Sequence, residues 1–401
     1  TYIALSVGGA TLVAWLGFGF GFDYAIERMA TVMVIACPHA LGLAVPLVIA
    51  VSTRLTAQNG LLIRDRAAFE RAHNLGVAMF DKTGTLTEGR FGISGVIALA
   101  DMPEDEILAW AAGLESQSEH PIAQGIVRGA KERGVKPKPV EEFKSLAGQG
   151  AEAVIERRGV RVVSPNYLAS HGLTPQNESV RKLGDEGNTV VYLLIDDKLV
   201  GAIALGDIIR KESFEAVARL KAMGIRCMMI TGDAAAVASS VATKLGLDDY
   251  FAEVLPHQKL EKVREVKARG ATVAMVGDGV NDAPALVESD LGIAIGAGTE
   301  VAVESADVVL VRSDPRDVFA IVALSRATYR KMVQNLLWAT GYNIVAIPLA
   351  AGVAYPWGIV ISPAVGAALM SLSTIIVAIN AQLLGRANTL VARAARSSAV
   401  V

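Results

Sequence analysis

Two pairs of long apolar stretches, one pair near each end of the chain, limit the folds that this sequence can adopt. The four stretches are residues 2–22, 25–51, 336–355 and 359–384. A helix that crosses a bilayer needs about 20 mostly apolar residues, so each stretch is long enough to cross once. Hydrophobic residues make up 52% of the chain and charged residues only 19%, which is typical of membrane helices joined to a water-soluble part. We therefore expect four membrane-spanning helices around a polar region of residues 52–334.

Basic residues predict which side of the membrane the polar region occupies. They follow the second stretch, precede the third and follow the fourth, whereas Asp23, Glu27 and Arg28 lie near the turn between the first two. The basic residues are Arg54, Arg64, Arg66, Arg71, Arg326, Arg330, Lys331, Arg386, Arg393 and Arg396. Because cytoplasmic loops carry an excess of Lys and Arg, we expect a multi-pass protein of the cell membrane whose polar region and C-terminal tail are cytoplasmic.

Charge and cysteine content argue against other classes of protein. A formal net charge of −2 gives no indication of a nucleic-acid partner. The two cysteines, Cys37 and Cys227, are too few for the framework of a disulfide-rich fold. The apolar start has neither a basic segment before it nor a cleavage site after it, so no signal peptide is expected.

Within the polar region, short apolar runs alternate with helical patterns. The runs typical of strands are residues 77–80, 200–205, 227–230 and 272–276, and the helical patterns include residues 214–223 and 235–245. This alternation predicts a doubly wound parallel sheet. A segment with its own strand at residues 189–195 interrupts the alternation, so we expect an inserted α+β domain.

These patterns give a predicted division of the chain. The membrane helices take residues 1–51 and 331–385, the sheet domain 52–90 and 201–330, the inserted domain 91–200, and a cytoplasmic tail 386–401.

Asp81 follows the first of the strand-like runs and begins the segment Asp81-Lys82-Thr83-Gly84-Thr85-Leu86-Thr87. A carboxylate at the carboxyl end of a parallel strand lies where open α/β sheets bind ligands. The hydroxyls and backbone N–H groups that follow it suit a phosphate. A carboxylate beside such groups can attack phosphorus and form an aspartyl-phosphate. The alternative is a polar turn that happens to contain one lysine. A lone Asp-Lys pair would favour that alternative, but the complete segment of residues 81–87 does not.

Two further loops after strands carry groups for the same chemistry. Thr231-Gly232-Asp233 offers a hydroxyl and N–H groups for a transferred phosphoryl group, and Gly277-Asp278-Gly279-Val280-Asn281-Asp282 offers carboxylates. Mg²⁺ prefers hard oxygen ligands, so we expect Asp81 and Asp278 to share one ion, with Thr83 and Asp282 in the same region. Lys259 offers a cation for charge that develops on the phosphoryl group. Each of these residues alone would more simply be a solvated loop residue.

Together these segments resemble the P-type ATPases, ion pumps that pass through a phosphoenzyme. Residues 81–87 resemble the phosphorylation motif of that family, and the other segments resemble its haloacid-dehalogenase-type phosphorylation domain in order and spacing. The resemblance implies that Asp81 accepts the γ-phosphate of ATP with Mg²⁺ as cofactor. It implies supporting roles for Lys82, Thr83, Thr231, Gly232, Asp233 and Lys259. Asp207 and Arg210 match a further Asp-x-x-Arg element, which implies a role toward the nucleotide.

The inserted domain resembles the nucleotide-binding domain of heavy-metal P-type ATPases. The resemblance rests on Glu115, on His120-Pro121 and on the loop Gly148-Gln149-Gly150. It implies that the His-Pro pair orients ATP and that the glycines let the backbone approach the nucleotide. By itself, His120-Pro121 would indicate a helix start. The chain departs from the family at Val163-Ser164-Pro165-Asn166, where a Gly-Asn pair is usual.

Cys37-Pro38-His39 lies in the middle of the second apolar stretch. Proline distorts a helix, and a local break would let Cys37 and His39 face one ion although they are two residues apart. A thiolate and an imidazole favour copper or zinc over magnesium or calcium. The alternative is a kinked helix with a small apolar Cys and a hydrogen-bonded His. An intramembrane His is costly, however, and is by default a functional-site candidate.

Polar and sulfur-bearing residues also interrupt the third and fourth apolar stretches. They are Tyr342, Asn343, Met370, Ser371, Ser373 and Thr374. As isolated features they would indicate helix packing. Beside Cys-Pro-His they resemble the ion site of heavy-metal P-type ATPases, in the copper-transporting subgroup in which His replaces the second Cys of Cys-Pro-Cys. The resemblance implies ATP-driven export of copper from the cytoplasm.

Three alternatives stay open at this point. Cys and Met favour Cu(I), whereas His accepts Cu(I) or Cu(II). A zinc- or cadmium-transporting pump would use similar ligands. A membrane-tethered haloacid-dehalogenase-type phosphohydrolase is the third alternative, although such phosphatases commonly carry a second aspartate two residues after the nucleophile, where this chain has Thr83.

The sequence contains no Thr-Gly-Glu motif, which the actuator domain of P-type ATPases uses to hydrolyse the phosphoenzyme. We therefore expect this chain to be the C-terminal portion of a pump whose actuator domain and N-terminal helices lie outside it. Alone, the chain is expected to be phosphorylated without efficient dephosphorylation.

Overall fold

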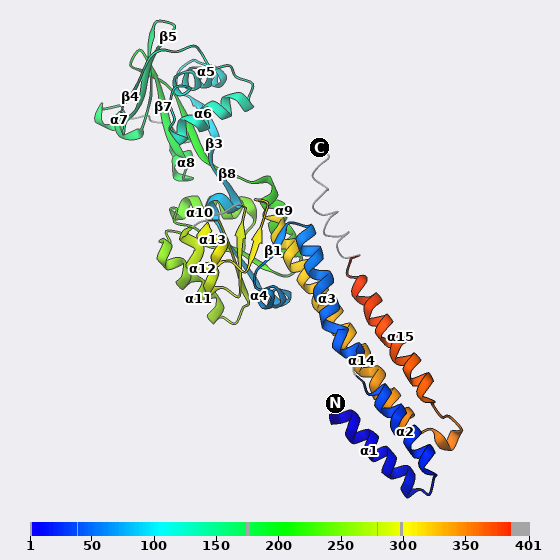
Figure 1. The fold of residues 1–401 in the computed structure, drawn as a ribbon. Coiled ribbons are helices and arrows are strands. Elements are labelled where there is room, and N and C mark those ends of the chain that lie inside the picture. The colour runs from blue at the N-terminus through cyan, green and yellow to red at the C-terminus, as the bar shows by residue number, and fades with distance from the viewer. Residues whose placement is uncertain are drawn as a thin grey trace. The chain divides into compact units, whose positions relative to one another are not determined.

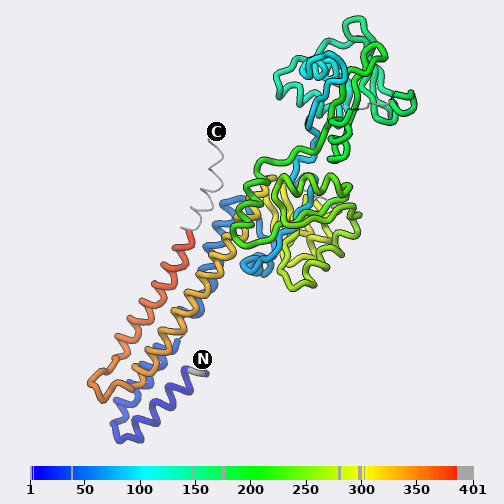
Figure 2. The backbone as a smooth tube through the Cα atoms, turned by 180° about the vertical axis from the view of Figure 1, so that it is seen from behind, coloured from blue at the N-terminus to red at the C-terminus, as the bar shows by residue number. Residues whose placement is uncertain are grey.

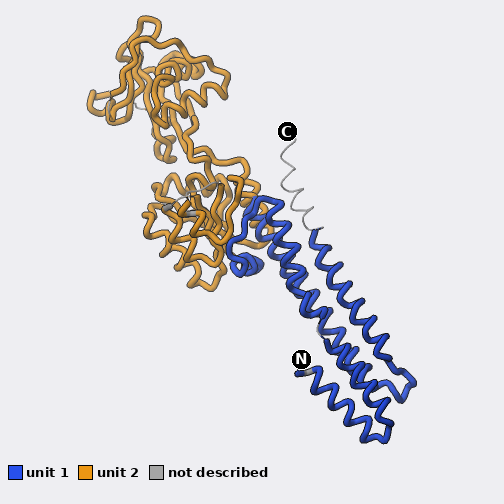
Figure 3. Tube along the Cα trace, in the orientation of Figure 1, with its two compact units in different colours: residues 1–74, 317–401 blue, residues 75–316 orange. Residues whose placement is uncertain are grey.

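The computed structural model describes residues 2–385 except residues 38, 147, 174–176, 279 and 297–299. The chain divides into two compact units (Figure 3). The helical unit comprises residues 1–74 and 317–401, and the α/β unit comprises residues 75–316. The predicted tail of residues 386–401 lies outside the described residues, as does Pro38 of the Cys-Pro-His motif.

The helical unit consists almost entirely of helices (Figures 1 and 2). Its elements are α1 (Tyr2–Gly17), α2 (Phe22–Ile35), α3 (His39–Gln58), β1 (Leu61–Ile63), α4 (Arg66–Arg71), η1 (Ala72–Asn74), α14 (Arg316–Ala351), η5 (Tyr355–Trp357) and α15 (Pro363–Gln382). Asp23, Glu27 and Arg28, which were expected near a turn, lie inside α2 because this helix begins directly after the turn at Phe22.

Two segments of the described chain are long and apolar enough to cross a membrane, Phe22–Gln58 and Pro363–Gln382. The first comprises α2 and α3 together with the residues between them. The first predicted span contains an apolar but shorter helix, Ala4–Gly17. The third lies mostly in α14, a continuous helix of 36 residues whose apolar part carries Asn343. These two spans stay predictions.

Small side chains let α3, α14 and α15 pack closely. Figures 1 and 2 both show α14 and α15 running side by side. The buried residues between these helices are Ala40, Ala44, Ala339 and Val377. Small residues are typical of helix interfaces in membranes, where close backbone approach replaces the hydrophobic driving force.

The second apolar stretch is broken where the sequence predicts a break. Helix α2 ends at Ile35 and α3 begins at His39, so Cys37 lies between two helices. Proline removes a backbone N–H and its ring clashes with the preceding turn, which explains why one continuous helix does not form here.

The α/β unit contains two sheets, and the first of them is parallel. Its strands are β2 (Val77–Asp81), β9 (Arg226–Ile230), β10 (Asp249–Phe251), β11 (Val273–Gly277), β12 (Leu291–Ile295) and β13 (Val308–Leu310). Within this unit they lie in the order β13-β12-β11-β2-β9-β10, and all pairs are parallel. Every residue of β2, β11 and β12 is buried, which requires cover on both faces.

Helices and short turns connect these strands. They are η2 (Lys82–Leu86), α9 (Lys211–Ala222), α10 (Ala235–Leu245), η3 (Pro256–Gln258), α11 (Lys259–Ala268), η4 (Val280–Asp282), α12 (Ala283–Glu288) and α13 (Glu300–Ser305). Parallel neighbours joined through helices confirm the predicted doubly wound fold.

A separate antiparallel sheet is formed by the segment that lies between β2 and β9 in the sequence. Its strands, in spatial order, are β3 (Thr87–Ala98), β8 (Lys198–Ile209), β7 (Thr189–Ile195), β6 (Arg158–Val163), β5 (Gly150–Ile155) and β4 (Glu141–Leu146). Its helices are α5 (Glu104–Glu115), α6 (Pro121–Glu132), α7 (Pro165–Ser170) and α8 (Glu178–Asp185). This arrangement confirms the predicted α+β insertion.

One strand prediction was wrong. Residues 200–205 were assigned to the parallel sheet, but they belong to β8, which pairs antiparallel with β3 and β7. All six residues are buried. One face of β8 packs with Ile107 and Leu108 of α5, and the other packs with Tyr167 and Leu168 of α7. Cover on both faces removes the alternation that normally distinguishes an antiparallel strand.

Candidate functional site

Asp81 is the last residue of β2, a strand with paired neighbours on both sides. It lies opposite Ile230 of β9, and the preceding Phe80 lies opposite Val276 of β11. The loops that follow these three parallel strands therefore emerge at the same edge of the sheet. Gly84 in the turn after Asp81 has a φ of +75°, and a Cβ there would lie 1.7 Å from a carboxylate oxygen of Asp278. Only glycine fits at this position.

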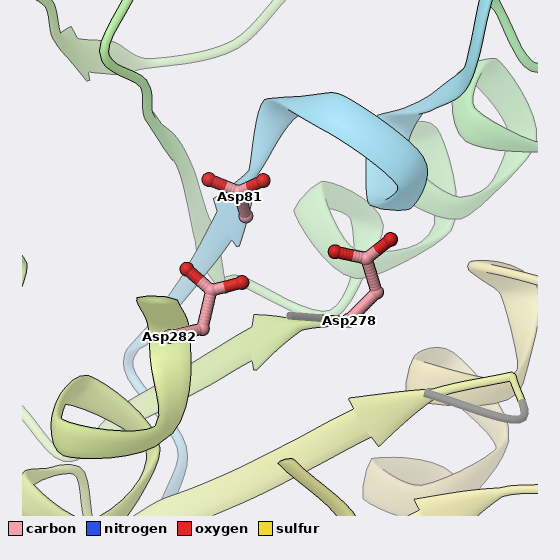
Figure 4. A group of neighbouring side chains, drawn as sticks. All are labelled: Asp81, Asp278 and Asp282. Atoms are coloured by element: carbon pink, nitrogen blue, oxygen red, sulfur yellow. The ribbon is translucent and has the colours of Figure 1, made fainter. Parts of the chain in front are cut away.

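Three carboxylates gather at this edge (Figure 4). One oxygen each from Asp81, Asp278 and Asp282 lies within 4.8 Å of the others. Lys259 at the start of α11 reaches into the cluster, and its Nζ lies 2.5 Å from Oδ1 of Asp81 and 2.6 Å from Oδ1 of Asp282. All but Asp278 are buried, and Asp278 is partly buried. The structure thus brings together the carboxylates that the sequence predicts for one magnesium ion.

Burial and repulsion by a neighbouring carboxylate disfavour the charged forms of Asp81 and Asp278. Burial, reinforced by Asp282, raises the pKa of Asp81 to about 7 although Lys259 opposes the shift. The pKa of Asp278 is raised by the same two causes. Burial lowers the pKa of Lys259, but the charges of Asp81 and Asp282 outweigh it, so that pKa is raised overall. Three acidic groups against one lysine leave an excess of negative charge, which a hard divalent cation would neutralise.

A second group of charges surrounds Lys82. Its Nζ lies 2.8 Å from Oδ2 of Asp233 and 3.5 Å from Oδ2 of Asp207. Thr231 donates its hydroxyl to Asp233 at 2.7 Å, and the Asp233 N–H returns a bond to Thr231 Oγ1 at 3.1 Å. Gly232 and Thr83 are exposed beside this group. A cavity of about 340 Å³ reaches Lys82, Thr83, Asp207 and Asp233.

Asp207 and Arg210 contact the motif itself. Asp207 accepts a hydrogen bond from Thr87 Oγ1 at 2.5 Å, and Arg210 donates to the carbonyl oxygens of Thr87 at 2.9 Å and Gly84 at 3.0 Å. Both residues therefore hold the turn after Asp81 in position. The sequence assigned them toward the nucleotide, and the structure adds this contact to the backbone of the turn.

The sequence grouped the Thr85 hydroxyl with that of Thr83 as suited to a phosphate, but Thr85 was not assigned to the site. Its hydroxyl is buried and has no hydrogen-bond partner among the described residues. A buried hydroxyl without a partner is costly, so its position two residues from Thr83 suggests a place for a phosphate oxygen or a water. The repeated threonine of Thr83-Gly84-Thr85 was the available signal.

A cavity of about 290 Å³ in the antiparallel part gathers four of the residues that the sequence predicts for nucleotide binding. Its walls include Glu115, His120, Gly148, Gly150 and Ser164. A Cβ at Gly150 would lie 2.0 Å from the carbonyl oxygen of Val162, so glycine is required there. Burial raises the pKa of Glu115 to about 7, against a hydrogen bond from Ser118 that lowers it.

His120 also has the structural role that the alternative predicted. It is the N-cap of α6, where its Nδ1 accepts from the Ile122 N–H at 3.3 Å and Pro121 occupies the first helical position. Both interpretations of His120-Pro121 are compatible, because the capping residue still lines the cavity.

In the helical unit, Cys37 Sγ and His39 Nδ1 lie 2.9 Å apart. The break between α2 and α3 thus brings the two side chains together. Tyr342 of α14 packs against the cluster around Val32 and Ile35 at the end of α2. The Tyr342 hydroxyl and the Ser373 hydroxyl on α15 are buried and have no hydrogen-bond partner in the part of the chain that the structure describes.

The other predicted residues of the membrane site differ in burial and in their hydrogen bonds. Asn343 and Met370 are half-buried, and the Met370 carbonyl accepts from the Thr374 hydroxyl at 3.1 Å. Ser371 is exposed and donates to the carbonyl oxygen of Ala367 at 3.0 Å. Ser371 therefore already has a partner, whereas the Ser373 hydroxyl has none among the described residues.

A family model and two relatives match most or much of this chain. Residues 76–290 match the model of haloacid dehalogenase-like hydrolases. The chain is 62% identical over 384 residues to a copper-exporting P-type ATPase B of Archaeoglobus fulgidus, covering 96% of this chain and 55% of that protein. It is 48% identical to a copper-exporting P-type ATPase B of Enterococcus hirae, covering 95% of this chain and 51% of that protein. The chain thus spans about half the length of these relatives.

A solved structure is also similar. A zinc-transporting PIB-type ATPase in an E2.Pi state superposes with a TM-score of 0.79 at 31% sequence identity, covering 94% of this chain and 62% of that one. This likeness includes helices and both sheets, since it extends over nearly the whole of this chain.

Proposed function

Since the chain belongs to the haloacid dehalogenase-like hydrolase family and resembles copper-exporting P-type ATPases over nearly its whole length, we propose that it is part of an ATP-driven copper exporter. The reaction passes through an aspartyl-phosphate at Asp81. The observation that carries this proposal is the position of Asp81, at the end of a central strand and among two further carboxylates and Lys259.

In the proposed reaction a carboxylate oxygen of Asp81 attacks the γ-phosphorus of ATP. The Asp81 oxygen–phosphorus bond forms, the bond from γ-phosphorus to the bridging oxygen breaks, and ADP leaves with that oxygen. Lys82, the Thr83 and Thr231 hydroxyls and the Gly232 N–H hold the phosphoryl oxygens. Lys259 favours the ionised form of Asp81 and stabilises the charge that develops in the transition state. Asp233 orients Lys82 and Thr231.

Mg²⁺ fits the donor set of the cluster, since its oxygens converge and their charge exceeds that of Lys259. Asp81 and Asp278 would hold the ion, with Asp282 and Thr83 in the same region. When bound, the ion neutralises phosphate charge. Asp282 also accepts from Lys259 at 2.6 Å, so it positions that lysine beside Asp81.

ATP is proposed to place its base in the cavity around Glu115. His120 forms one rim, and Pro121 begins α6 directly after it. Gly148 and Gly150 form the loop that lets the backbone approach the base. Asp207 and Arg210 act through the turn after Asp81, because their bonds fix its backbone.

The proposed ion site comprises Cys37, His39, Tyr342, Asn343, Met370, Ser371 and Ser373. Its support is the close approach of Cys37 to His39, together with the buried Tyr342 and Ser373 hydroxyls, for which the described part of the chain offers no hydrogen-bond partner. Thiolate, imidazole and thioether ligands suit copper, which is the ion named for the relatives at 62% and 48% identity. The actuator domain and further N-terminal helices would complete this pump, with the α/β unit in the cytoplasm.

Metal-stimulated ATP hydrolysis by the full-length protein tests the choice of ion. We expect stimulation by copper, supplied as Cu(I) under reductant or as Cu(II), and weaker stimulation by Zn²⁺ or Cd²⁺. Stimulation by Zn²⁺ alone would overturn the copper assignment in favour of the function named for the superposed zinc transporter. Hydrolysis of small phosphate esters without any metal-ion response would instead favour a tethered phosphohydrolase.

A further inference from the structure

A groove of about 410 Å³ runs between α14 and α15 in the helical unit. Gln334, Asn335 and Trp338 line it from α14. Their spacing of one and three residues puts them on one side of that helix. Ile376, Ile379 and Asn380 line it from α15 with the same spacing. The groove is therefore a feature of two facing helix surfaces and does not depend on a loop.

The basic residue Lys331 lies next to this groove and contacts one of its lining residues. Lys331 lies one helical turn before Gln334 and Asn335, and its Nζ donates to Asn380 Oδ1 at 2.7 Å. Its partner is a neutral amide, and Lys331 makes no ion pair within the described ranges. An ammonium group has three donors, so two stay available for an anionic oxygen. Arg330 beside it is exposed.

The amide groups behind Lys331 are fixed by further hydrogen bonds. Asn380 donates to Asn335 Oδ1 at 2.7 Å, and Asn335 donates to the carbonyl oxygens of Ala44 on α3 at 3.1 Å and Val377 on α15 at 3.3 Å. Asn335 is 1% exposed. The polar end of the groove is therefore a preorganised network across three helices.

The remaining lining of the groove is apolar and exposed. Trp338 is 46% exposed and Ile379 is 56% exposed. Two turns of α14 separate Trp338 from Lys331, so the indole and the ammonium group lie on one helix face about 10 Å apart along the axis. Trp is enriched at the level of lipid headgroups, where its ring is apolar and its N–H is polar.

We propose that this groove binds one anionic phospholipid. Its phosphate lies at Lys331 and Arg330, and one acyl chain lies along Trp338 and Ile379. Basic pockets between membrane helices on the cytoplasmic side bind anionic headgroups. The charge selects this occupant, because a zwitterionic headgroup would bring its own cation toward Lys331. The proposal rests on the membrane orientation of the proposed function, which places Lys331 on the cytoplasmic side.

Quenching of Trp338 fluorescence by brominated phospholipids tests this site in the full-length protein. The protein is reconstituted in nanodiscs with increasing mole fractions of dibrominated phosphatidylglycerol or dibrominated phosphatidylcholine. The difference between the natural protein and Trp338→Phe isolates the signal of Trp338, one of the four tryptophans of this chain. We expect the anionic lipid to half-quench this signal at a mole fraction several-fold lower than the zwitterionic lipid.

Charge removal provides the decisive comparison. The double variant Arg330→Gln with Lys331→Gln keeps an amide donor for Asn380 but removes both charges. It is expected to lower the preference for the anionic lipid by about fivefold per basic residue. Arg54→Gln removes one exposed charge from α3, away from the groove, and is expected to keep the preference.

Two results would overturn the proposal. Equal quenching by both lipids would mean that ordinary, unselected lipid fills the groove. Absence of quenching by either lipid would mean that a protein segment covers it. The measurement needs neither ATP nor copper, so a failed copper or phosphorylation assay leaves its outcome unaffected, and the converse also holds.

Discussion

The carboxylate cluster of the α/β unit and the Cys37 region of the helical unit differ in how their polar groups are satisfied. In the cluster, Lys259 already bonds to Asp81 and Asp282, so the chain itself supplies counter-charge. In the helical unit, the Tyr342 and Ser373 hydroxyls are buried and lack partners among the described residues. The carboxylate cluster is therefore held together by its own ion pairs, whereas no hydrogen bond to these two hydroxyls is found among the described residues of the helical unit.

The two sites are positioned by different kinds of interaction. A parallel sheet fixes Asp81 and Asp278 by strand register, and the surrounding ion pairs preserve the geometry without substrate. Buried hydroxyls without partners in an apolar helix bundle are costly, and an ion or water that accepts their bonds would recover that cost. We therefore expect substitutions in the cluster to affect catalysis strongly, and substitutions among the hydroxyls to act mainly on ion affinity.

The largest effect is expected for Asp81→Asn. An amide cannot attack phosphorus, so ATP hydrolysis by the full-length protein should fall by roughly three orders of magnitude or more. Metal-stimulated release of phosphate measures this loss. The exposed Asp101→Asn is the matched control and should retain activity. Comparable activity in both variants would remove Asp81 from the reaction.

A smaller loss is expected for Lys259→Met. This change removes the cation beside Asp81 and should lower kcat by about 10²-fold, with a smaller change in KM, because the cation acts most strongly in the transition state. It also leaves Asp81 and Asp282 without their shared partner, at a cost of roughly 3–5 kcal/mol in the free energy of unfolding. Lys262→Met on the exposed side of α11 is the control, and an equal fall in kcat there would contradict the role of Lys259.

The carboxylate cluster was accessible to sequence reasoning because strand topology brings loop residues together. The cluster is formed by residues from separate segments of the chain. Asp81 ends β2, Asp278 follows β11, and Lys259 contacts Asp81 from the start of α11. The contacts of Asp207 and Arg210 with the motif backbone were not accessible, because they depend on where β8 ends relative to β3. The error at residues 200–205 has a related cause, since burial on both faces hides the type of sheet.

The Cys37 region was predicted for a different reason. Pro38 alone implies a break in the helix, and a break brings residues two apart to one side. Which hydroxyl of α15 is buried could not be predicted, since Ser371 and Ser373 have the same chemistry. The rotation of α15 about its axis determines which of the two serines is buried. That rotation depends on the contacts of small residues between α3, α14 and α15.

Glu115→Gln is expected to change stability in a pH-dependent way. Burial raises the pKa of Glu115 from 4.5 to about 7, so this group's contribution to stability is fully present below pH 4.5 and is lost as pH rises through 7. The amide does not titrate. At pH 8 the variant should therefore be more stable than the natural protein, by on the order of 2 kcal/mol, and near pH 4.5 the difference should vanish.

Thermal unfolding between pH 4.5 and 8 measures this difference. Glu132→Gln, at an exposed position of α6, is the control and should show no such trend. A constant difference between Glu115→Gln and the natural protein at all pH values would contradict the burial of an ionisable carboxyl at this position.

The smallest effect is expected in the helical unit. Ser373→Ala removes a buried hydroxyl that has no partner within the described ranges, so the free energy of unfolding should change by no more than about 1 kcal/mol. The copper concentration for half-maximal ATP hydrolysis should nevertheless rise several-fold, because a ligand position is lost. Ser371→Ala removes a hydroxyl that is bonded to Ala367 and should shift that concentration less. A larger shift for Ser371→Ala would exchange the roles of the two serines.

Phosphorylation of Cys37→Ala in the full-length protein tests the central claim most directly, namely that metal at the helix break controls phosphate transfer to Asp81. We predict that copper-dependent labelling from γ-labelled ATP is lost in Cys37→Ala, while labelling from inorganic phosphate is retained. Cys227→Ala is the matched control, since that thiol is fully buried in β9 and should keep both reactions. Copper-dependent labelling of Cys37→Ala from ATP at the natural level would contradict the account.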